Sequence, residues 1–267
     1  MNEIIKIVKE NTEGEEMYQL NNFFDTTNMK QTAQMGPFRV FEHEKDLSVN
    51  PGNAVAAYYA SQMNVRKRQV FVELGKSGCV TQAGAMQWML GEVSMKSDVK
   101  GVGNLLGKMA SAAVTKETAI KPLYTGTGVM MLEPTYKHIL LVDVSEWGSI
   151  VLDDGLFLAC EDTIQQKTVA RSNISSAVLG NEGLFNLSLV GNGVAVLESP
   201  VPKEELIEIE LVNDVVKIDG NMAIAWSGSL NFTVEKSSKS LLGSAVSGEG
   251  LVNVYRGTGK ILMTPTA

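Results

Sequence analysis

Apolar and polar residues alternate with a period of two over much of the chain. In residues 205–211, isoleucine or leucine alternates with glutamate, and residues 185–189 and 230–234 show the same alternation with other polar partners. A period of two is typical of a β-strand with one buried face. Residues 138–144 are apolar at nearly every position, which indicates a central strand covered by a layer on each side.

A repeat of about 65 residues organises these strands. Gly-X-Gly sequences begin at Gly126, Gly191 and Gly257, and each is followed by a short apolar run and a proline. Asp154-Gly155 and Asp219-Gly220 keep the same spacing, and such pairs suit tight hairpins because they tolerate positive φ. We therefore predict a mainly β protein, an antiparallel β-sandwich or flattened barrel of duplicated strand modules.

The repeat also suggests how the chain is divided. We expect an N-terminal segment with early strands over residues 1–65 and a repeated β-module domain over residues 66–267. Copies of the module are expected near residues 66–120, 121–185 and 186–267. Between residues 101 and 117, leucine, methionine and alanine recur at helical spacing, which predicts a short helical insertion.

Composition narrows the possible functions. The chain has 267 residues, of which 44% are hydrophobic, and a formal net charge of -7. A hydrophobic fraction of this size supplies a packed core, whereas an acidic balance disfavours binding to nucleic acid, whose phosphates must be neutralised. The chain shows no signal-peptide pattern and no apolar run of transmembrane length. With only two cysteines, it suits a reducing compartment, and we expect a cytoplasmic protein.

Few residues could carry catalysis. The only histidines, His43 and His138, lie in a charged segment and at the start of an apolar strand, and neither belongs to a nucleophile motif. Cys79 and Cys160 lie in strand-like apolar surroundings and show no metal-ligand spacing. We therefore expect no catalytic residue, no metal site and no cofactor.

Two other features remain open. Glu182 and Glu249 recur at equivalent repeat positions, where turn formation explains them more simply than paired-carboxylate chemistry. The repeat-turn positions of possible interest are Glu182, Gly183, Gly191, Gly193, Glu249, Gly250, Gly257 and Gly259. Residues 66–68 form a basic run, Arg-Lys-Arg, which is typical of a hairpin tip or a protected edge strand, with RNA contact as the alternative.

Three stretches resemble a known family. Residues 246–260, 181–193 and 83–89 match characteristic stretches of the altered-inheritance-of-mitochondria (mitochondrial biogenesis) family, formerly a domain of unknown function, and the resemblance covers roughly residues 65–267. It implies a fold similar to the tryptophan RNA-binding attenuation protein, a β-sandwich class prone to ring or trimer assembly. Fungal members are associated with organisation of the mitochondrial inner membrane. The family defines no catalytic residues that could be carried over.

These observations favour a non-enzymatic binding or scaffolding protein that self-assembles and has an unknown protein partner. The alternative is a sensor or enzyme that holds a small ligand in a carboxylate-lined site between modules. RNA binding through residues 66–68 is the third hypothesis.

Overall fold

The computed structural model describes residues 7–10, 16–23, 26–96, 121–170, 185–236 and 251–266, and these form mainly antiparallel β-strands. The mainly β prediction is confirmed. The helical insertion expected at residues 101–117 lies outside the described residues. The α-helix in the described part, α1 (Ala54–Gln62), falls in a region where only strands were predicted.

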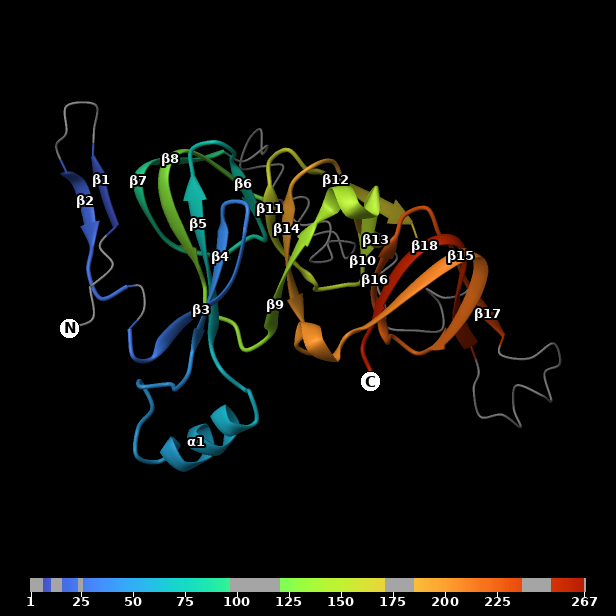
Figure 1. Cartoon of the computed structure of the whole chain (residues 1–267), viewed down its shortest axis with the longest axis horizontal. Coiled ribbons are helices and arrows are strands. Elements are labelled where there is room, and N and C mark those ends of the chain that lie inside the picture. The colour runs from blue at the N-terminus through green and yellow to red at the C-terminus, as the bar shows by residue number, and fades with distance from the viewer. Residues whose placement is uncertain are drawn as a thin grey trace, which may run out of the picture.

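The strands form three sheets, labelled in Figure 1. A hairpin near the N-terminus joins β1 (Ile7–Glu10) and β2 (Glu16–Leu20). The nine-stranded sheet has the order β3 (Met29–Met35), β4 (Phe38–His43), β5 (Arg68–Leu74), β8 (Leu123–Leu132), β6 (Cys79–Thr81), β11 (Phe157–Glu161), β14 (Val194–Ser199) and β9 (His138–Asp143), and β7 (Met86–Lys96) also pairs with β8. The seven-stranded sheet has the order β12 (Gln165–Ala170), β13 (Phe185–Val190), β10 (Ser149–Leu152), β16 (Ala223–Ser227), β18 (Leu251–Met263) and β15 (Ile207–Asp219), and β17 (Asn231–Lys236) also pairs with β18. Two 3-10 helices, η1 (Val144–Trp147) and η2 (Lys203–Glu205), follow β9 and precede β15.

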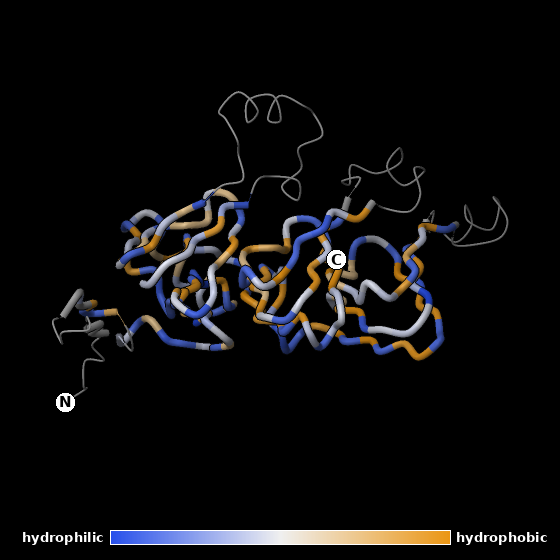
Figure 2. The backbone as a smooth tube through the Cα atoms, turned by 90° about the horizontal axis from the view of Figure 1, so that it is seen from above, coloured by the Kyte–Doolittle hydropathy of each residue, from blue (hydrophilic) through white to orange (hydrophobic). Residues whose placement is uncertain are grey.

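The nine-stranded sheet curls into a nearly closed barrel, so its first strand, β3, and its last strand, β9, meet at a seam. The seven-stranded sheet forms a half-barrel beside it (Figure 1). In Figure 2, short hydrophobic and hydrophilic stretches follow one another along the tube. Buried side chains that fill the barrel include Phe38, Val70, Val72, Leu74, Tyr124, Met130, Leu132, Leu158, Val194 and Val196.

Strand β9 contributes to two cores. Leu140 and Val142 pack in the core between the two large sheets, whereas Ile139 and Leu141 pack against the interior of the barrel. The prediction that both faces of this strand are covered is confirmed. Its predicted central position is wrong, because β9 ends the sheet and the coverage comes from a second sheet packed against it.

The Gly-X-Gly segments are not all turns. Residues 191–193 connect β13 to β14, but residues 126–128 and 257–259 lie inside the continuous strands β8 and β18, so the prediction of turns at these two is wrong. At Gly126, a methyl group would overlap the carbonyl oxygen of Glu92 on β7. Glycine there allows β7 and β8 to pair in regular register from Trp88 to Lys96.

The N-terminal segment covers an apolar outer face of the barrel. Tyr18, Leu20 and Phe23 pack on a cluster that includes Phe71 and, partly buried, Trp88. The Phe23 ring centroid lies 5.3 Å from that of Phe71 and 5.7 Å from that of Trp88. Aromatic packing at these separations holds the segment between β2 and β3 against the barrel.

Candidate binding groove

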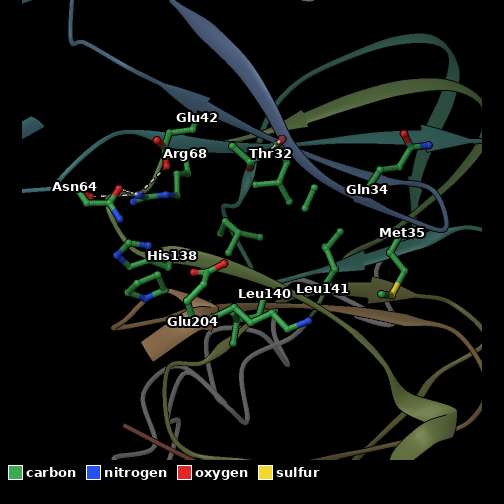
Figure 3. Close-up of a pocket in the computed structure, with 15 residues that line it drawn as sticks. Thr32, Gln34, Met35, Glu42, Asn64, Arg68, His138, Leu140, Leu141 and Glu204 are labelled. Carbon is green, nitrogen blue, oxygen red and sulfur yellow. Dashed lines mark hydrogen bonds and ion pairs between the residues drawn. The ribbon is translucent and has the colours of Figure 1, made fainter. Parts of the chain in front are cut away.

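A groove follows the seam of the barrel. Within the described residues, β3 pairs only with β4 and β9 only with β14, so each strand presents one edge to the seam. The hollow between them has a volume of about 450 Å³, and the segment entering η2 forms part of its wall. Figure 3 shows Thr32, Gln34 and Met35 on one side of the gap, facing His138, Leu140, Leu141 and Glu204 on the other.

Alternate peptide groups of β9 are directed into this seam. The N–H of Val144, immediately after β9, donates to the carbonyl of Gly193 at 3.0 Å and therefore faces β14. The direction of hydrogen bonding alternates along an antiparallel strand, and the pairing of β9 with β14 has no register shift. The peptide groups of Val142, Leu140 and His138 therefore also form hydrogen bonds toward β14. The peptide groups directed to the seam are those of Ile139, Leu141 and Asp143.

A buried arginine fixes the polar end of the groove. Arg68 is 4% exposed, and its guanidinium lies 2.8 Å from a carboxylate oxygen of Glu42. It also donates to the side-chain oxygen of Asn64 at 2.7 Å and to the backbone carbonyls of Asn64, Arg66 and Tyr136. The second oxygen of Glu42 pairs with Arg66 at 2.8 Å. This network compensates the charge of the buried guanidinium and fixes where β4, β5 and the residues before β9 meet.

His138 lies on the opposite wall of the polar end. Burial lowers its pKa below the ordinary value, the positive charge of Arg68 lowers it further, and Glu42 and Glu204 act in the opposite direction. The imidazole is therefore neutral at neutral pH, with one nitrogen that donates and one that accepts a hydrogen bond. The polar end of the groove thus combines the uncharged imidazole of His138 with the Arg68–Glu42 ion pair, whose charges compensate each other.

A second hollow of about 230 Å³ continues the groove. It shares Met35, Leu140, Leu141 and Lys203 with the first hollow and extends toward Trp147 and Lys260. The floor shared by the two hollows is therefore apolar, whereas charged side chains lie along the rims. The carboxylates that line the two hollows belong to Glu42, Asp143, Glu146, Glu204 and Glu208, and the cations belong to Arg68, Lys203 and Lys260.

None of the predicted repeat-turn residues that the structure describes lines this groove. Four of them, Glu182, Gly183, Glu249 and Gly250, lie outside the described residues. Gly191 and Gly193 lie against β11 and the turn that follows it, and Gly257 and Gly259 lie within β18. The Glu161 carboxylate beside Gly193 accepts hydrogen bonds from the Val194 N–H and the Ser77 hydroxyl, each at 2.8 Å, so it is bound internally.

The basic run at residues 66–68 is also bound internally. Arg66 and Arg68 share the Glu42 carboxylate, and Lys67 pairs with Asp46 at 2.7 Å. Each of the three cations thus has an acidic partner within the chain. The prediction of a protected edge strand is wrong, because Arg68 begins β5, which pairs with β4 on one side and with β8 on the other. The ion pairs weaken the use of this run as an RNA-binding patch, because phosphate would have to displace these carboxylates.

The remaining candidates for chemistry are separated. Cys79 and Cys160 are both buried, and they belong to different cores on opposite faces of the sheet. Burial raises the pKa of Cys160 to about 12 and that of Cys79 well above its ordinary value. Among the described residues, no cluster of three or more histidine, cysteine or acidic side chains could hold a metal ion. The described part also contains no helix long and apolar enough to cross a membrane.

Sequence reasoning missed the groove itself. Arg68 and His138 lie 70 positions apart, one in the basic run and the other at the start of an apolar strand, so no local pattern connects them. The doubly apolar pattern of residues 138–144 carried the available signal, because the strand it predicts also supplies the floor of the groove. Only the closure of the sheet brings β3 opposite β9.

The fold and groove define an all-β protein in which an incompletely closed barrel packs against a half-barrel and leaves a groove at its seam. The family model described as mitochondrial biogenesis AIM24 matches residues 59–266. The chain therefore belongs to the mitochondrial biogenesis AIM24 family, which confirms the resemblance noted from sequence.

Two similar proteins come from Streptococcus pyogenes. An uncharacterized protein of serotype M6 is 29% identical over 201 residues, covering 72% of this chain and 79% of that protein. The crystal structure of the protein SPYM3_0169 is similar with a TM-score of 0.55 and 26% identity, covering 76% of this chain and 89% of that one. Neither description states an activity.

Proposed function

We propose that this protein is a non-enzymatic binding and scaffolding module that holds an extended polypeptide segment of a partner protein in the groove between β3 and β9. The observation that carries the proposal is the pair of strand edges facing each other across the seam. An inserted segment would pair with β9 through backbone hydrogen bonds and leave its side chains to determine specificity, as in strand addition to an exposed sheet edge.

The edge of β9 and the lining of the groove suit such a segment. Strand β9 has six residues, so its edge extends roughly 20 Å and matches a partner strand of similar length. Leu140 and Leu141 belong to its apolar floor, and Met35 lies at the point where the two hollows join. Side chains that alternate along an inserted strand would contact this floor on one face and the charged rims on the other.

Charge favours a partner segment with basic residues. Carboxylates outnumber cations along the two hollows, and the buried cation, Arg68, already has an internal partner. Lys260 pairs with Glu208 in the same way, so the carboxylates of Glu204 and Glu146 are left to contact a lysine or arginine of the segment. Complementary charge of this kind chiefly sets partner choice and association rate, while backbone pairing supplies the orientation.

Hydrogen exchange with selected peptides tests the proposal. Peptides of about ten residues displayed on phage are selected on the full chain, and an enriched peptide is then added during exchange. We expect the seam-directed amides of Ile139, Leu141 and Asp143 to exchange at least about tenfold more slowly with peptide bound. The amides of Leu140 and Val142, which face β14, serve as controls on the same strand and should change little.

A groove variant provides the second measurement. Met35→Arg places a long cation at the junction of the two hollows and should weaken binding of the selected peptide. The matched control is Val212→Arg on β15, which is 81% exposed and lines neither hollow. If the peptide protects amides elsewhere, or binds Met35→Arg and the control equally well, strand addition at the seam is refuted.

A small-ligand sensor is the second candidate. A hollow of about 450 Å³ lies within the range of small-molecule sites, and its polar end combines neutral His138 with Glu204. A thermal-shift screen of small molecules should then give hits that raise the melting temperature of the wild-type chain and are lost in His138→Ala. Hits that bind His138→Ala unchanged would exclude this end of the groove.

A further inference from the structure

Helix α1 carries an apolar stripe on its outward face. Val55, Tyr58 and Tyr59 follow the i, i+3, i+4 spacing of one helix face, and Met63 continues the stripe at the C-cap. Their exposed fractions are 69%, 57%, 65% and 79% in that order. A surface helix ordinarily turns such a stripe toward the core. In α1 the large apolar side chains instead face away from the barrel.

Small residues occupy the face that α1 turns toward the barrel. Ala57, Ala60 and Ser61 line a hollow of about 60 Å³ shared with Val65 and Tyr136, and Ser61 is the buried residue of the helix. No residue of α1 belongs to any of the four hydrophobic core clusters of the described chain. Figure 1 shows the helix away from both sheets. Contacts among the described residues therefore do not explain the stripe.

The stripe lies in an uncharged region of an acidic protein. Residues 47–65 contain no aspartate, glutamate, lysine, arginine or histidine, although the chain carries a net charge of -7. The adjoining charges are neutralised locally by the Lys67–Asp46 and Arg66–Glu42 pairs. Two identical acidic molecules repel each other over most of their surfaces, so a neutral region is where they can approach.

We propose that α1 is the surface through which two copies of this chain associate, with the stripes of Val55, Tyr58, Tyr59 and Met63 facing each other across a two-fold axis. The four side chains expose on the order of 500 Å² of mostly apolar surface. Two such stripes bury roughly 1,000 Å² in total, which is the lower limit for a specific interface. An uncharged patch is complementary to itself, as a two-fold contact requires.

A lipid surface fits the helix less well than a second copy. Helices that lie on membranes combine an apolar face with a polar face rich in lysine or arginine. The opposite face of α1 carries alanine and serine, and the nearest cations, Arg66 and Lys67, are paired with carboxylates. The proposal concerns a surface separate from the seam groove and extends the scaffolding role to self-association.

Sedimentation equilibrium of the full chain from about 1 to about 100 µM tests the proposal. We expect the wild-type chain to form a dimer, and the double variant Tyr58→Glu/Tyr59→Glu to raise the dissociation constant at least about tenfold, because the variant places four carboxylates in the contact. The control Val212→Glu also adds a charge to an exposed apolar site and should dimerise like the wild type. A wild-type chain that stays monomeric throughout, or a double variant that dimerises normally, overturns the proposal.

Cross-linking gives a readout that keeps the stripe intact. Cys79 and Cys160 are buried, so a cysteine introduced at exposed Gln62, beside the stripe, is the accessible thiol among the described residues. A bifunctional maleimide should convert Gln62→Cys, but not Val212→Cys, into a covalent dimer. Equal cross-linking of the two variants would contradict the proposal. If the wild-type chain stays monomeric and sediments with phosphatidylcholine vesicles through Tyr58 and Tyr59, the proposal is overturned, and the stripe binds a lipid surface instead of a second copy.

Discussion

Gly126 and Gly257 allow the role of close strand packing to be measured separately from backbone strain. The two glycines begin the first and third Gly-X-Gly segments and have nearly the same φ, +122° and +124°. Their surroundings differ. A methyl group on Gly126 would overlap the Glu92 carbonyl oxygen, whereas one on Gly257 would lie 3.7 Å from its nearest neighbour, the Ser229 carbonyl oxygen. Alanine therefore imposes the same backbone strain at both sites, but it creates a steric conflict only at Gly126.

A β-bulge accounts for the difference in space. Strand β15, which pairs with β18, has a register shift between Leu211 and Asp214, and this irregularity lies opposite residues 257–259. Strand β7 pairs with β8 in regular register through Gly126. A bulge bends the strand that carries it, so β15 and β18 are paired less tightly here than β7 and β8.

The expected magnitudes follow from these contacts. At a φ that only glycine adopts readily, alanine costs about 1–3 kcal/mol, of which about 0.4–1 kcal/mol is offset by the lower entropy of the unfolded chain. Gly257→Ala should therefore lower the free energy of unfolding by roughly 1–2 kcal/mol. Gly126→Ala should cost about 2–3 kcal/mol more, because β7 must move and give up about two backbone hydrogen bonds.

Urea denaturation followed by circular dichroism measures both values under the same conditions. The reasoning requires Gly126→Ala to be clearly the less stable variant, and its hydrogen exchange to increase along β7 and the paired part of β8. Equal losses for the two variants would refute it, since close approach of β7 to β8 would then contribute nothing beyond the backbone strain.

Three further predictions concern buried polar groups. Burial and the nearby Arg68 guanidinium lower the pKa of His138, so the unfolded chain binds more protons than the folded chain near pH 6.5. The free energy of unfolding should therefore fall as the pH drops from about 7.5 to about 5.5. In urea titrations, His138→Gln should reduce this dependence on pH. Cys79 and Cys160, protonated at pH 8, should not react with a thiol reagent in the native chain but should react once it is unfolded in denaturant. Arg68→Ala should cost about 3–5 kcal/mol in denaturant titrations, because it leaves the Glu42 carboxylate with Arg66 alone and removes the donor to three backbone carbonyls. Arg256→Ala breaks an exposed ion pair and should cost less than about 1 kcal/mol.

The candidate groove was beyond sequence reasoning for a specific reason. The chain shows Arg68 as part of a basic run and His138 as the first residue of an apolar strand. Nothing in their local patterns relates them, because the contact between β3, β9 and the segment before β15 depends on how far the sheet curls. The outward stripe of α1 was missed because strands were predicted there and because a stripe alone does not reveal which way it faces.

Strand content and the family resemblance could be read from the amino-acid sequence, because side-chain alternation and local motifs are properties of neighbouring residues. The sequence also indicated that residues 138–144 have two covered faces. Three features could be seen only once the chain was folded: this strand ends its sheet, two of the three Gly-X-Gly segments lie within strands, and β3 and β9 leave a groove between them. Each of these depends on sheet curvature and on the approach of distant strands, which are set by packing across the cores.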